Sequence, residues 1–149
     1  MTPYFLNVDL EIVSKTSLDS LARDMGRRVI VLHCGPFANR HLLVLESSRQ
    51  HKRPDAAIAA LCSAIEHLAP ATKRIWQAAS KDFDVGYELR SSERSSRFTL
   101  RPGTLERVAR LGATLTVTYY REDGGENAPP SRRPARQPPV GKPRRGGGR

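Results

Sequence analysis

Three segments of the sequence alternate apolar and polar residues at every second position, and this period constrains the fold more than any other feature. The segments are Tyr4–Val13, Phe83–Leu89 and Leu115–Tyr119. Because successive side chains of a strand point to opposite faces of a sheet, a period of two predicts strands with one face in the core and one in water. We therefore expect a sheet that other elements cover on one face only.

Two further runs, Arg28–Cys34 and His41–Ser47, are rich in Val, Ile and Leu and predict the strands of an antiparallel hairpin. The segment between them, Gly35–Arg40, contains Gly, Pro and Asn, which favour turns. If Cys34 lies opposite His41, one face holds Ile30, Leu32, Cys34, His41, Leu43 and Leu45, and the other holds Val29, Val31, Leu42 and Val44. A hairpin that is apolar on both faces must be covered by its own chain or by a partner.

Apolar residues at helical spacing predict helices between these strands. A short helix over Leu18–Met25 follows Ser17, a capping residue, and ends at Gly26. A longer helical region, Pro54–Ser80, begins with a proline, and Pro70 within it predicts a kink or break.

The last third of the domain predicts a short apolar return, Phe98–Leu100, and then a helix from Pro102 that ends at Gly112. This helix is expected to bury Leu105, Val108, Ala109 and Leu111. The order of elements is then β-α-β-β-α-β followed by an added α-β. We predict an α+β fold with a ferredoxin-like β-α-β-β-α-β arrangement, in which helices cover one face of an antiparallel sheet. The 149 residues suit one such domain, over residues 1–123.

Residues 124–149 differ in composition from the rest of the chain, being rich in Pro, Gly and Arg. They hold seven basic residues and one acidic residue, so that +6 of the net charge of +10 lies here and residues 1–123 carry +4. A segment with so few large apolar residues cannot offset its chain entropy by burial, and we predict a disordered tail. The basic residues are Arg132, Arg133, Arg136, Lys142, Arg144, Arg145 and Arg149. Arginines spaced in this way can contact phosphates, which makes RNA binding a candidate function of the tail.

Several stretches together resemble a family of small bacterial domains of unknown function. They are YFLNVDLEI near the start, HLLVLES, HLAPATKRIWQAA and DFDVGYEL in the middle, and FTLRPGTLERVARLGATLTVTYY at the end. The resemblance covers about residues 3–121. It departs from the family pattern near the first helix and hairpin, where a strand bearing tryptophan is commoner. The resemblance supports the fold and implies no catalytic residues.

Cys34 and His41 are the candidate catalytic residues. Directly opposed side chains in a hairpin have Cβ atoms about 4.5–5.5 Å apart, so a thiol and an imidazole could meet. A nucleophilic thiol also needs a lowered pKa and a base with an orienting partner, and the sequence indicates no such partner. Another register would place Arg40 or Leu42 opposite Cys34 instead. A structural thiol beside a histidine at a strand end is the alternative interpretation.

Neither a metal site nor a cofactor is expected. His33 and Cys34 are adjacent and point to opposite faces, while Cys62 and His67 lie on different sides of a helix. No glycine-rich phosphate loop occurs. Asp82, Asp84 and Glu88 are interpreted as a solvated strand face, and the serines and arginines of residues 90–97 as a polar turn.

The function that the sequence favours is a non-enzymatic module that binds a protein partner, or a second copy of itself, through a sheet edge or face. RNA binding through the tail and a small Cys/His-dependent enzyme are the alternatives. The two cysteines and the lack of an apparent signal segment or membrane span predict a reduced cytoplasmic protein.

Overall fold

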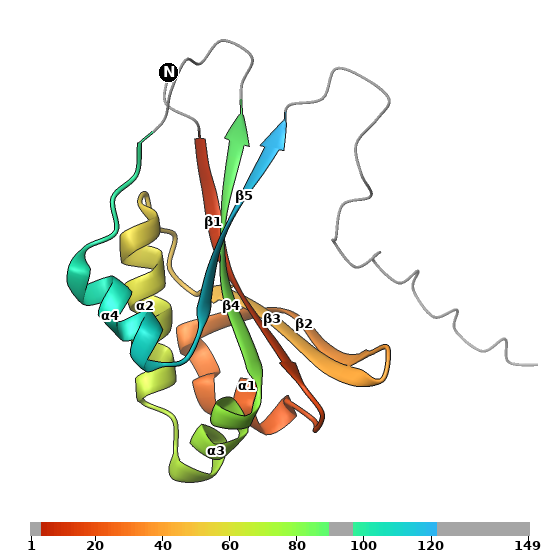
Figure 1. The fold of residues 1–149 in the computed structure, drawn as a ribbon. Helices are drawn as coiled ribbons and strands as arrows, with labels where there is room; N and C mark the ends of the chain where they lie inside the picture. The colour runs from red at the N-terminus through yellow and green to blue at the C-terminus, as the bar shows by residue number, and fades with distance from the viewer. Residues whose placement is uncertain (1–3, 90–96, 122–149) are drawn as a thin grey trace, which may run out of the picture.

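The computed structural model describes residues 4–89 and 97–121. Its strands are β1 (Tyr4–Ser14), β2 (Val29–Phe37), β3 (Arg40–Ser47), β4 (Ser80–Leu89) and β5 (Thr114–Arg121). Its helices are α1 (Asp19–Met25), the 3-10 helix η1 (Gly26–Arg28), α2 (Pro54–Glu66), α3 (Pro70–Ala78) and α4 (Pro102–Arg110). The α-helices lie on one side of the sheet (Figure 1). The predicted α+β class is confirmed.

The five strands form one mixed sheet in the order β2-β3-β1-β4-β5. Within this order, β2 pairs with β3, β3 with β1, and β1 with β4, and all three pairs are antiparallel, as predicted. β5 runs parallel to β4, which departs from the predicted antiparallel sheet. The reason is the connection: a crossover through α4 brings the chain back to the same end of the sheet before β5 begins.

The core fills the space between the helices and the inner face of the sheet. The predicted period of two is confirmed in β1 and β4, where alternate residues are buried. These buried residues are Val8, Leu10, Ile12, Phe83, Val85 and Tyr87. From the helices, Leu21, Ile58, Leu61, Ile65 and Trp76 complete the layer. The opposite face of the sheet, which carries none of the described helices (Figure 1), is called the open face below.

The first residues of β1 depart from the predicted pattern. Tyr4 and Leu6 were expected in the core but are exposed, whereas Phe5 packs against it. The pairing with β4 shifts between Phe5 and Asn7, which is the signature of a β-bulge. Because a bulge inserts one residue into the alternation, the side chains before it change faces.

Two predictions in the helical and loop regions are corrected by tertiary packing. Leu105 and Ala109 are exposed; Val108 is buried as predicted, and Thr104 is buried in addition. Residues 97–101 form no strand, and Phe98 stacks on Tyr87 with 5.2 Å between ring centroids.

The predicted break at Pro70 is confirmed, because α2 ends at Glu66 and α3 begins at Pro70. No helix in the described ranges is both long enough and apolar enough to cross a membrane.

Candidate functional site

The outer strand of the hairpin, β2, carries four large apolar side chains that its own chain leaves uncovered. Ile30, Val31, Leu32 and Phe37 are 46%, 44%, 50% and 59% exposed. We call these four residues the apolar edge. Within the described part of the chain, β2 has β3 as its only neighbour in the sheet. No Lys, Arg, Asp or Glu occurs from Val29 to Phe37. Natural proteins often protect an edge strand from pairing with other chains by placing charges on it, and this strand carries none.

Burial differs sharply between the two strands of the hairpin. Leu43 and Leu45 of β3 are fully buried, because β3 lies inside the sheet and faces α2. On β2, α1 packs against the strand but leaves the apolar edge exposed. The chain therefore buries Leu43 and Leu45 of β3 and Val29 at the start of β2, but leaves the apolar edge uncovered. This edge stays available to a partner.

In the observed hairpin register, Cys34 and His41, the candidate catalytic residues, do not lie opposite each other. Leu43 lies opposite Cys34, and His41 lies opposite Pro36, so the conditional pairing of Cys34 with His41 is wrong. The pairing shifts between Val31 and His33, which places a bulge at Leu32. Turn length and this bulge decide the register, and the alternation of side chains does not reveal either of them.

Cys34 instead contacts a carboxylate. Its Sγ donates a hydrogen bond to Oδ1 of Asp19 at 3.3 Å. Burial, followed by this hydrogen bond, raises the pKa of the Cys34 thiol. The other cysteine, Cys62, is buried in α2, and burial raises its pKa to about 11. Both thiols therefore stay protonated at neutral pH and are weak nucleophiles.

The open face of the sheet is acidic. Asp9 lies between Glu46 and Asp84, and Glu11 lies opposite Asp82. Asp82 accepts hydrogen bonds from Thr114 and Thr116, and Asp84 accepts one from Thr118, so β5 supports these carboxylates. Among the described residues, no three His, Cys, Asp or Glu side chains are grouped to hold a metal ion.

The arginines and the lysine proposed for RNA binding lie outside the described residues, as do the serines and arginines of residues 90–96. The former are Arg132, Arg133, Arg136, Lys142, Arg144, Arg145 and Arg149. The disordered tail predicted for residues 124–149 lies outside the described ranges as well.

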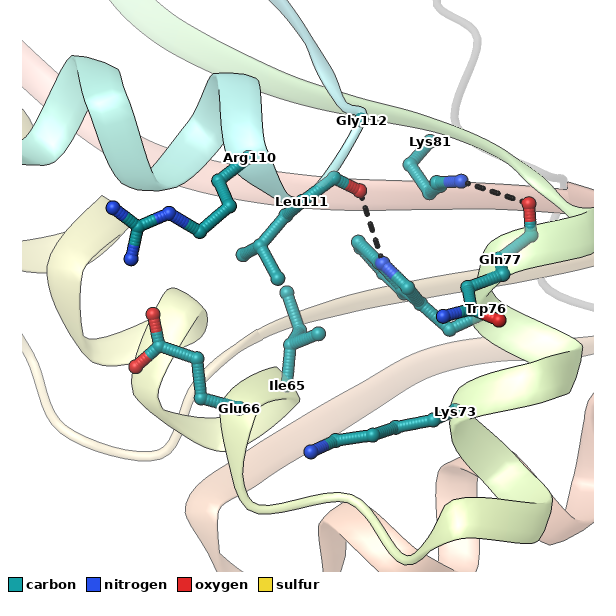
Figure 2. A pocket seen from close by; sticks show the side chains of 9 residues that line it. All are labelled: Ile65, Glu66, Lys73, Trp76, Gln77, Lys81, Arg110, Leu111 and Gly112. Carbon is teal, nitrogen blue, oxygen red and sulfur yellow. Dashed lines mark hydrogen bonds between the residues drawn. The ribbon is translucent and has the colours of Figure 1, made fainter.

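On the helical side, α2, α3, α4 and the start of β4 surround a hollow of about 420 Å³ (Figure 2). Lys73, Lys81 and Arg110 line it together with apolar side chains. Sequence reasoning missed this group, because its members come from three elements and carry no common motif.

Searches against protein-family models, curated proteins and solved structures found no match to this chain. The resemblance to a bacterial domain family therefore stays a prediction.

Proposed function

We propose that this protein is a non-enzymatic interaction module that associates with a second copy of itself through the apolar edge. The observation that carries the proposal is the exposure of Ile30, Val31, Leu32 and Phe37 on an uncharged outer strand. Removing such side chains from water stabilises an interface by about 25 cal/mol for each Å² of apolar surface buried. Covering the apolar edge therefore lowers the free energy of the protein.

Self-association is favoured over an unlike partner because the apolar edge complements itself. In a two-fold interface, the same patch of both subunits meets. With no charged side chain between Val29 and Phe37, such a contact buries no unpaired charge on either copy. The bulge at Leu32 and the missing N–H of Pro36 interrupt a regular backbone ladder. Side-chain packing, with short stretches of strand pairing, then holds the two copies together.

The chemistry of Cys34 supports a role without catalysis. Its thiol is hydrogen-bonded to Asp19, and its pKa is raised. A nucleophilic cysteine needs the opposite environment, in which a positive neighbour favours the thiolate.

The strand order supports the proposed ferredoxin-like assignment of the first four strands. In the order β2-β3-β1-β4, β3 separates β1 from β2, and β1 separates β3 from β4. Each pair of separated strands is joined through helices, which is the split β-α-β pattern. We also propose a reducing, cytoplasmic location, which the free thiols of Cys34 and Cys62 support.

The test is the mass of the full chain in solution, measured by light scattering over a range of concentrations. We expect a dimer that dissociates on dilution. Leu32→Lys places a charge in the apolar edge and is expected to give a monomer. Leu105→Lys is the matched control, because Leu105 has a similar exposure, 46% against 50% for Leu32, but lies on α4.

Two results would contradict the proposal. One is a wild-type monomer at about 0.1 mM, a concentration at which an association of about −5.5 kcal/mol would be half complete. The other is a dimer that survives Leu32→Lys as well as it survives Leu105→Lys. Circular dichroism of both variants verifies that each remains folded.

A further inference from the structure

The hollow on the helical side of the sheet has an apolar floor and a basic rim (Figure 2). The floor consists of Ile65, Trp76 and Leu111, and the rim consists of Lys73, Lys81 and Arg110. Its volume of about 420 Å³ lies within the range of small-molecule sites, about 300–1,000 Å³. The hollow is thus large enough for a small organic ligand.

The one carboxylate that lines the hollow is already neutralised. Both oxygens of Glu66 accept hydrogen bonds from Arg107, at 2.9 and 2.8 Å. Arg110 pairs with Glu106 one turn away on its own helix. Neither Lys73 nor Lys81 forms an ion pair with a carboxylate of the described residues. The hollow therefore has a net positive charge contributed by two lysines.

Lys81 is held in place without a counter-charge. Its Nζ donates a hydrogen bond to the carbonyl oxygen of Gln77 at 3.3 Å and lies 5.4 Å from the centre of the Trp76 ring. Partial burial lowers the pKa of Lys81, because removal from water disfavours the ammonium form. An anion bound beside this group would offset that cost.

Gly112 follows the end of α4 and lies beside Lys81. It has a positive φ of 68°, which a residue with a side chain rarely adopts, and a Cβ built there would make an ordinary van der Waals contact, at 3.8 Å, with Nζ of Lys81. The backbone conformation, and not the space beside the ammonium, therefore accounts for the glycine.

We propose that this hollow binds a small organic anion. The carboxylate or phosphate of the ligand pairs with the ammonium groups of Lys73 and Lys81 on the rim, and its apolar body packs against Leu111. This site lies on α2, α3, α4 and β4, whereas the apolar edge lies on β2. Binding here is independent of self-association.

Trp76 supplies the readout, because it is the single tryptophan of the chain and lies in the floor of the hollow. Phenyl phosphate and benzoate are the probes, added to the full chain at constant ionic strength, and phenol is the uncharged control. We expect a saturable change in tryptophan emission with at least one anion, and binding of phenol at least tenfold weaker. The more effective anion distinguishes a phosphate ligand from a carboxylate ligand. An absence of saturation with both anions would overturn the proposal.

Variants locate the binding. We expect Lys73→Gln and Lys81→Gln each to weaken binding of the effective anion by about tenfold, as the loss of one charge-assisted contact predicts. Lys52→Gln is the matched control, because Lys52 is exposed and precedes the opposite end of α2. Lys73 is exposed on α3, so its substitution leaves the core intact. Equal affinity in Lys73→Gln and Lys52→Gln would contradict the assigned site.

Discussion

Asp9 of β1 lies directly opposite Glu46 of β3 on the open face of the sheet. On its other side, Asp84 of β4 is again directly opposite. Like charges across paired strands destabilise a sheet, and this row places three carboxylates side by side. All three residues are half-buried, so the repulsion between their carboxylates makes the stability of the fold sensitive to charge and salt.

Replacing Glu46 with Gln removes one charge from the row while keeping the shape of the side chain. We expect Glu46→Gln to raise the free energy of unfolding by about 0.2–1 kcal/mol at low ionic strength. The long hydrogen bond from Asn7 to Glu46, 3.4 Å, can be retained by the amide oxygen. Urea denaturation measures the difference, which should shrink in about 1 M NaCl, where the screening length is about 3 Å. An unchanged or lower stability at low salt would contradict repulsion across this row.

The pair of Glu66 and Arg107 joins α2 to α4 and predicts a dependence on pH. The hydrogen bonds from Arg107, followed by its charge, hold the pKa of Glu66 below its usual 4.5. The stability from the pair is therefore complete above this usual value and is lost as pH falls through the lower pKa of the folded state. Because Glu66 is 42% exposed, we expect a contribution of at most about 1 kcal/mol.

Unfolding of wild type and Glu66→Gln across pH measures this contribution. We expect the wild type to be more stable at pH 7 and the two proteins to converge under acid conditions. Glu106→Gln, which breaks the exposed pair with Arg110 within one helix, serves as the control and should have a smaller effect. A difference between wild type and Glu66→Gln that persists after acid protonation would assign the effect to packing instead.

Trp76 connects α3 to the end of α4. Its indole Nε1 donates a hydrogen bond to the carbonyl oxygen of Leu111 at 3.1 Å, and its side chain is buried. We expect Trp76→Phe to lower the free energy of unfolding by about 1–3 kcal/mol, since a partly buried carbonyl loses its donor and the smaller ring leaves a cavity. Denaturation followed by circular dichroism measures the loss. Leu105→Ala, at an exposed position of α4, is expected to stay within about 0.5 kcal/mol of wild type.

The contact between Asp19 and Cys34 predicts how the thiol reacts. Asp19→Asn removes a negative neighbour that helps to raise the pKa of Cys34, so we expect faster labelling of this cysteine at pH 8. Mass spectrometry of labelled peptides separates Cys34 from Cys62, whose pKa of about 11 keeps it unreactive. If wild-type Cys34 instead reacted with an apparent pKa below 9.0, its usual value, the enzymatic hypothesis would be favoured.

Much of the secondary structure could be predicted from the sequence, because it depends on neighbours along the chain. The alternation in β1 and β4, the break at Pro70 and the end of α4 before Gly112 all follow from local geometry. The same local patterns failed where a bulge intervened, at Leu6 and at Leu32, since a bulge is invisible in a pattern of apolar residues.

The candidate sites were predictable in part. The apolar character of both hairpin faces indicated a surface in need of a partner, and the apolar edge is the part of that surface left exposed. The hollow was not predictable, because Lys73, Lys81 and Arg110 come together only when α3, α4 and β4 pack on one another. The spacing of these residues along the chain does not indicate that they lie close together in the fold.

The sequence by itself determined most of the segments that form strands and helices, and the apolar residues of β4, of α2 and of β1 beyond its bulge that enter the core, because side-chain periodicity acts over a few residues. The tertiary structure decided the hairpin register that places Leu43, and not His41, opposite Cys34, and the parallel pairing of β5 with β4. These features depend on backbone hydrogen bonds and packing between distant segments, whose relative stability emerges only when the whole core assembles.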